Sequence, residues 1–82
     1  MLTKETKDQL AAMFNPFVKI THQHYQENMV ATVKLSSISM VSTDANGKSV
    51  VVVDGLRLDV TNKESLKVQE LLTVAYGEAI AL

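Results

Sequence analysis

The chain has 82 residues, with eight basic and nine acidic side chains and no cysteine. This length predicts one domain, residues 1–82, with a small core. At this size disulfides, a metal ion or association with another chain usually supply additional stability. The lack of cysteine excludes disulfides and thiolate metal sites, which leaves association with a partner. The near balance of charge argues against a protein whose main ligand is a polyanion.

The sequence contains no apolar run near the roughly 20 residues that a membrane span needs. Residues 1–8 are charged and lack the apolar stretch of a signal peptide. We therefore expect a soluble cytoplasmic protein without a membrane partner.

A short amphipathic helix is predicted at the beginning of the chain. Thr3 or Thr6 would begin it, and Thr6 with Gln9 has the spacing of a capping box. Asn15 would end the helix, because a residue that precedes proline is disfavoured in helical geometry. The apolar face, with helical spacing, would consist of Leu10, Met13 and Phe14.

From residue 17 to residue 60 the pattern changes to β-branched residues with alternating polarity, which favours strands. We predict a strand at residues 17–25, a turn at 26–28 and a longer strand at 29–43. In the longer strand, Val33 and Leu35 would face one side and Ile38 and Met40 the other. This change of phase at Ser36-Ser37 predicts a β-bulge.

Residues 44–48 carry the clearest turn signal, because Asn46-Gly47 is typical of a type I′ β-hairpin. The segment 50–60 then allows two arrangements. Either one strand continues through a bend at Gly55, or Asp54-Gly55 forms a second tight turn. The continuous strand is preferred, since a turn would leave two very short strands.

The last predicted element is the strongest helix. Thr61 would be its N-cap and Glu64 would complete a capping box. The helix is expected to continue to the end of the sequence with Gly77 inside it, where a close packing contact would explain the glycine. Its apolar stripe would consist of Val68, Leu71, Leu72, Ala75, Ala79 and Leu82.

These elements predict an α+β fold in a small single domain: a helix, an antiparallel sheet of three strands and a second helix. A fourth strand is the alternative arrangement. Both helices would cover one face of the sheet.

The polar residues do not suggest an enzyme. His22 and His24 would point to the same side of a strand, but a stable zinc site needs three or four ligands. No serine lies in a nucleophile elbow, and the three glycines are too scattered for a phosphate-binding loop. We therefore expect no catalytic residue, no metal, no cofactor and no small-molecule substrate.

Apolar residues exceed what two helices can cover. The valine run would place apolar side chains on both faces of the sheet. On the last helix, Val74 and Ile80 would lie off the main stripe, with Tyr76 at its margin. Uncovered apolar surface usually marks an interface. The leading hypothesis is therefore a non-enzymatic interaction protein that forms a homodimer and binds a protein partner. A regulator or inhibitor of the kind encoded by phages or other mobile elements would fit this description.

The alternative hypothesis is RNA binding. The order helix, three strands, helix resembles the topology of double-stranded-RNA-binding domains, which hold phosphates with lysines at the start of their last helix. Lys63 and Lys67 would have that role here, and Lys34 or Lys48 would assist from the sheet.

Overall fold

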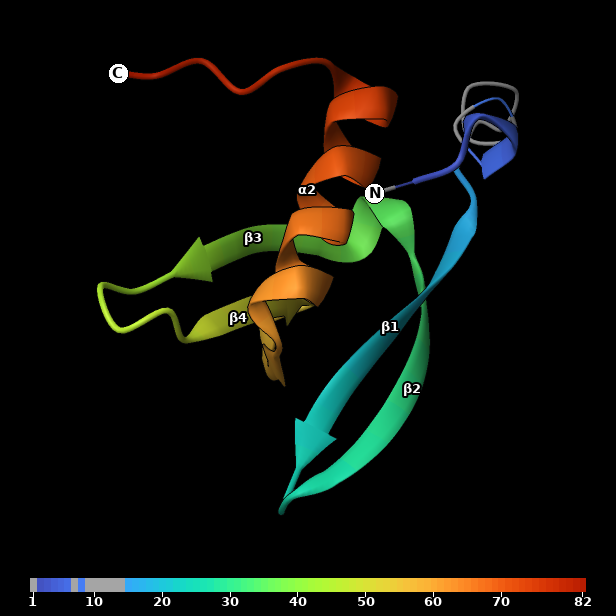
Figure 1. Cartoon of the computed structure of the whole chain (residues 1–82). Coiled ribbons are helices and arrows are strands. Elements are labelled where there is room, and N and C mark those ends of the chain that lie inside the picture. Colours follow the sequence, from blue (N-terminus) through green and yellow to red (C-terminus); the bar gives the residue numbers. More distant parts are fainter. Residues whose placement is uncertain (1, 7, 9–14) are drawn as a thin grey trace.

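The computed structural model describes residues 2–6, 8 and 15–82. Five strands, one 3-10 helix and a long α-helix follow one another in the chain (Figure 1). They are β1 (Phe17–His24), β2 (Glu27–Lys34), η1 (Leu35–Ser37), β3 (Ile38–Thr43), β4 (Ser49–Val53), β5 (Leu56–Val60) and α2 (Asn62–Tyr76). The α+β class is confirmed, whereas the predicted number of strands was too low.

The strands form one antiparallel sheet in the order β2-β1-β5-β4-β3. The two outer strands, β2 and β3, are joined by the three residues of η1. A link this short cannot cross a flat sheet of five strands that lie almost 5 Å apart, roughly 19 Å in all. The sheet therefore curls until its two edges meet at η1. Two hydrogen bonds extend the neighbouring ladders to this corner, from Leu35 N–H to the Pro16 carbonyl and from Asp54 N–H to the Ser37 carbonyl.

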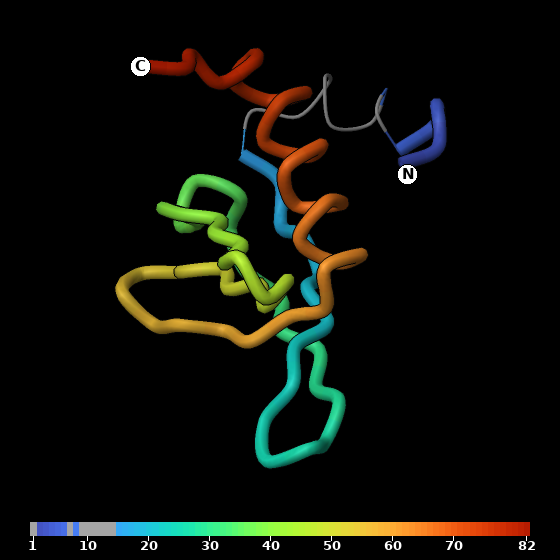
Figure 2. The backbone as a smooth tube through the Cα atoms, turned by 60° about the vertical axis from the view of Figure 1, so that its left-hand side comes forward, coloured from blue at the N-terminus to red at the C-terminus, as the bar shows by residue number. Residues whose placement is uncertain are grey.

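The core lies inside this curl and is closed by α2, which packs on β1, β3 and β4 (Figure 2). Ile20 and Val51 are fully buried in the sheet, and Val68 covers them from the helix. Leu35 at the corner is 2% exposed. The other buried members of the cluster are Val18, Ile38, Val53, Leu58, Val60 and Leu71.

The helix α2 begins as predicted and ends earlier than predicted. The Thr61 hydroxyl accepts the Glu64 N–H at 3.1 Å, so Thr61 is the N-cap. The helix ends at Tyr76, because Gly77 has φ +88° and caps it by donating its N–H to the Thr73 carbonyl. A Cβ at Gly77 would meet nothing within 4 Å, so the glycine serves this positive φ and not a packing contact.

The β3–β4 hairpin is confirmed, but its turn differs from the predicted type I′. Gly47 has a positive φ and Asn46 does not, so residues 44–48 form a type I turn followed by a glycine bulge. Asp44 explains the choice, because its carboxylate accepts the N–H groups of Asn46 and Lys48, each at 2.9 Å.

The preferred continuous strand at residues 50–60 was wrong. Asp54 and Gly55 have φ values of +49° and +82° and form a tight turn between β4 and β5. Short strands suffice here because β4 also pairs with β3 along its whole length. The valine run consequently does not supply uncovered apolar surface: Val52 is half-buried, and the buried members are Val50, Val51 and Val53.

The predicted strand at 29–43 is divided between β2 and β3. The corner η1 lies where the change of phase was expected, and a register shift between Ile38 and Met40 follows it. The first turn also differs, since residues 25–26, and not 26–28, connect β1 to β2.

Near the start of the chain, residues 4–6 and 8 are helical. The Thr3 hydroxyl accepts the Thr6 N–H at 3.2 Å, so Thr3 is the cap. Leu2 N–H donates to the Glu70 carboxylate at 2.9 Å, which holds this end beside α2. The predicted apolar face and the predicted role of Gln9 lie outside the described residues. None of the helices in the described part is long and apolar enough to cross a membrane.

Replacement of the corner residue should destabilise the protein strongly. Leu35→Ala is expected to lower the free energy of unfolding by about 2–5 kcal/mol, because it leaves a cavity where the sheet edges meet. Urea denaturation followed by circular dichroism measures the effect. Leu66→Ala is the control, since Leu66 is 54% exposed on α2; equal midpoints for the two variants would contradict the importance of the corner.

The β1–β2 turn should be easy to stabilise. Tyr25 and Gln26 have φ values of +47° and +65°, a left-handed geometry that favours Asn-Gly over the present residues. The double variant Tyr25→Asn, Gln26→Gly is expected to raise the free energy of unfolding by about 1 kcal/mol, because the strain is relieved. The same urea titration tests this, and a lower midpoint would show that Tyr25 makes a stabilising contact.

Candidate interaction site

A groove lies between β1 and α2, with the start of the chain as its third wall. We call it the β1 groove; its volume is about 440 Å³. Its apolar lining includes Val18, Val68 and Leu71, and its charged lining comes from Lys19, Glu64 and Lys67. The groove therefore combines apolar and charged side chains.

Alternate residues of β1 direct their backbone N–H and C=O groups away from β2. Leu35 N–H donates to the Pro16 carbonyl at 2.9 Å. In an antiparallel pair, hydrogen-bonded positions alternate, so Val18 and Ile20 also bond to β2. The intervening residues Phe17 and Lys19 direct their N–H and C=O groups away from β2. In the described part of the chain, β5 pairs with β1 at Gln23 alone and does not reach these groups.

Glu64 occupies the end of this edge. Its carboxylate accepts the Thr21 N–H at 2.7 Å and lies 3.8 Å from the Lys67 ammonium group. The predicted capping box is therefore half formed. Thr61 caps Glu64 as expected, but the Glu64 side chain turns to the strand and supplies the acceptor that β5 does not provide.

A second groove, of about 600 Å³, lies on the opposite flank of α2 against β3. We call it the β3 groove. Met40 lines it from the sheet and Tyr76 from the last turn of the helix, and residues 77–79 also line it. Residues 77–82, here called the tail, then lead away from the body on this flank (Figures 1 and 2).

The three residues predicted for association lie in different surroundings. Val74 is half-buried and packs against the core cluster, so its side chain helps to hold α2 to the sheet. Tyr76, the last residue of α2, is 64% exposed. Ile80 is 87% exposed and belongs to the tail, because the helix ends before it. Tyr76 and Ile80 are thus both exposed and lie four residues apart in the chain, whereas Val74 is half-buried.

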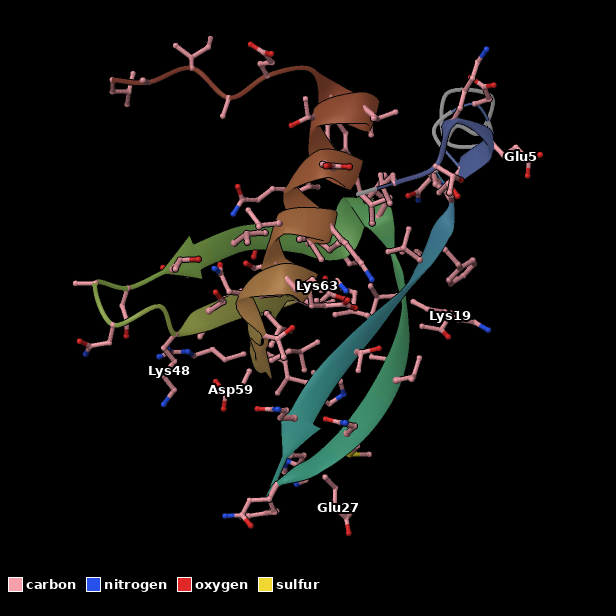
Figure 3. The ribbon with its side chains drawn as sticks, viewed as in Figure 1. Glu5, Lys19, Glu27, Lys48, Asp59 and Lys63 are labelled. Atoms are coloured by element: carbon pink, nitrogen blue, oxygen red, sulfur yellow. The ribbon has the colours of Figure 1, made fainter. Side chains whose placement is uncertain are left out.

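The four lysines of the RNA hypothesis come from separate elements. Lys63 is exposed on the first turn of α2, and Lys48 is exposed in the β3–β4 loop (Figure 3). Lys34 ends β2 beside η1, at the other end of β3 from that loop. Lys67 lies in the β1 groove near Glu64. The described structure does not gather the four into one basic surface.

The histidine pair lies near the tip of the β1–β2 hairpin, which extends beyond the rest of the sheet (Figures 1 and 2). His22 is half-buried and His24 is exposed, and the ring of His24 stacks edge-on against Tyr25 with centroids 4.3 Å apart. Among the described residues no three side chains of metal-binding type come together.

Sequence reasoning missed Phe17 and the open edge of β1. Phe17 is 65% exposed because it lies on the exposed phase of β1, whose first residues are alternately exposed and buried. An aromatic residue on the polar phase of a strand was the available signal. The pairing of β1 with β5 depends on where β5 ends, and no local pattern encodes that relation.

The contact between Glu64 and β1 should be measurable. Glu64→Ala is expected to lower the free energy of unfolding by about 1–3 kcal/mol, because Thr21 N–H loses its charged acceptor. Glu64→Gln keeps an oxygen acceptor and should lose less. Urea denaturation of the two variants tests the role, and equal losses would show that the charge of Glu64, not its hydrogen bond, holds the strand.

Comparison with known proteins gives no family for this chain. No protein-family model matches it, and neither a curated protein nor a solved structure matches it. The contacts and surfaces described above are therefore the basis for a functional proposal.

Proposed function

We propose that the protein is a small, non-enzymatic interaction protein that self-associates and acts by binding another macromolecule. The observation that carries this proposal is the apolar end of the chain. Tyr76, Ile80 and Leu82 project from the end of α2 and from the tail, and each is more than half exposed.

The size of the core supports self-association. The inner face of α2 is already used, with Val68 and Leu71 buried against the sheet. A chain of this length gains little further stability from its own core, so burial of apolar surface between copies is the available source. Burial of a side chain such as Ile80 contributes roughly 1.5–3 kcal/mol.

The local geometry also supports an interface at this end. The first residues of the tail line the β3 groove together with Met40, which is 49% exposed. Exposed apolar residues that lie together, as Met40 and Tyr76 do in this groove, are typical of surfaces that bind other proteins. The RNA hypothesis receives no comparable support, since its lysines come from separate elements.

A single charge should test the association surface. The parent protein is expected to elute as a dimer in size-exclusion chromatography with light scattering. Ile80→Glu should elute at the monomer mass of 9.0 kDa with an unchanged circular dichroism spectrum, because an ionised side chain is costly to bury.

Leu66→Glu is the matched control, since it places the same charge on an exposed leucine of α2. It should leave the dimer intact. A parent protein that is monomeric, or a dimer unaffected by Ile80→Glu, would contradict the proposed surface. Because the chain has two tyrosines and no tryptophan, a large absorbance at 260 nm that disappears in salt would instead support RNA binding.

A further inference from the structure

We propose that the tip of the β1–β2 hairpin carries a binding site for copper(I), formed by His22, His24 and Met29. This inference goes beyond the proposed function, because it assigns a metal ion and not a macromolecular partner. It rests on the pairing of β1 with β2, which places three metal-binding donors on one face of the hairpin.

The three side chains share the core-facing side of the hairpin. Side chains two residues apart on a strand point the same way, so His22 and His24 continue the row of Val18 and Ile20. Met29 lies directly opposite His22 in the register, and opposed residues share a face. The core-facing row thus changes from apolar residues to metal-binding donors where the hairpin extends beyond the rest of the sheet (Figures 1 and 2).

The spacing of the three residues suits one ion. Residues two apart on a strand have Cα atoms about 6.7 Å apart. Opposed residues such as His22 and Met29 are about 5.5 Å apart or closer. In this structure the ring of His24 rests edge-on against Tyr25, with centroids 4.3 Å apart. His24 is exposed, so rotation of its side chain toward His22 breaks that one contact.

The donor types select the metal. Among the described residues no three histidine, cysteine, aspartate or glutamate side chains come together, so the two imidazoles need a donor of another type. The Met29 thioether is such a donor, and its soft sulfur suits copper(I). Zinc takes thiolate, imidazole or carboxylate ligands, and magnesium and calcium take oxygen. Two imidazoles with one thioether therefore favour copper(I).

The charge of the tip also favours a cation. Residues 22–29 contain no lysine or arginine, and Glu27 is their one acidic residue. Glu27 lies opposite His24 in the register and so starts on the same face as the donors. A carboxylate at this distance attracts a cation. Met29 is 45% exposed, so an ion reaches the sulfur from solvent.

The tight turn keeps the donors in register. Tyr25 and Gln26 form a two-residue connection, and the pairing continues without a shift up to His24 and Glu27. Both turn residues have a positive φ, which is costly for residues other than glycine. Backbone strain of this kind is found preferentially at functional sites. From the sequence alone only the two histidines were visible; the third donor comes from the register of β2, which no local pattern encodes.

Nuclear magnetic resonance tests the site with copper(I) itself, added without oxygen as its acetonitrile complex to the full-length protein. One equivalent should shift the methyl resonance of Met29 and the ring resonances of both histidines. Met40 is the matched control within the same chain, since it is 49% exposed and lies on β3. Its methyl resonance should stay in place. The variants Met29→Leu and Met40→Leu identify the two methyl signals.

The same titration has two results that would overturn the inference. One is a Met29 methyl resonance that does not move. The other is an equal shift of the Met29 and Met40 methyl resonances, which would show unspecific contact of copper with exposed thioethers. One equivalent of Zn²⁺ should leave the Met29 methyl resonance unchanged, because a thioether is not a zinc ligand; a shift as large as that with copper(I) would also contradict the site.

The affinity provides a second measurement. Competition with bicinchoninate, a coloured chelator of copper(I), gives the dissociation constant in the presence of ascorbate. Met29→Leu should raise it more than about tenfold, because a donor is lost while the volume of the side chain is kept. Met40→Leu should leave it unchanged. Equal constants for the two variants would exclude Met29 as a ligand, and neither measurement depends on whether the protein is a dimer.

Discussion

The three-residue corner η1 is the constraint on which the remainder of this structure depends. It joins β2 to β3, the two outermost strands of the sheet, and so forces the sheet to curl. Leu35 fills the inside of the corner and is almost completely buried. Because the sheet curls, its apolar residues face one enclosed space, and one helix is sufficient to close that space. The small core of this short chain is therefore efficient, with Ile20, Val51 and Val68 packed at its centre.

In the part of the chain that the structure describes, the same curl leaves β1 incompletely paired. β1 is eight residues long and pairs with β2 over its whole length, whereas β5 is five residues long and meets β1 at Gln23. The helix must start directly after β5 in order to close the core, so the chain cannot also continue along β1. At Thr21, where β5 supplies no acceptor, the Glu64 carboxylate accepts the backbone N–H instead. Closure of the core and the short pairing of β1 with β5 thus have a common cause.

Much of the fold could be predicted from the sequence, because local patterns encode it. The Thr61 cap, the stripe through Val68 and Leu71, the hairpin at residues 44–48 and the change of phase before Ile38 were all identified. The errors arose where one local pattern fits two geometries. Asp54-Gly55 suits both a bend and a turn, and pairing of β4 with β3 decides between them. Gly77 suits both a helix interior and a helix end, and its positive φ decides.

The candidate site could be predicted less well from the sequence, for a physical reason. Tyr76 and Ile80 could be chosen because they are large apolar residues outside the helical stripe, but Val74 satisfies the same rule and packs against the core. The rule failed at Val74 because this residue lies within α2, three positions after the buried Leu71, and so shares its side of the helix. The β1 groove depends on the relation between β1, β5 and α2, elements that are distant in the chain. An edge of this kind is a property of topology: the residues along it look like those of an ordinary strand, and what distinguishes them is the partner strand that ends too soon.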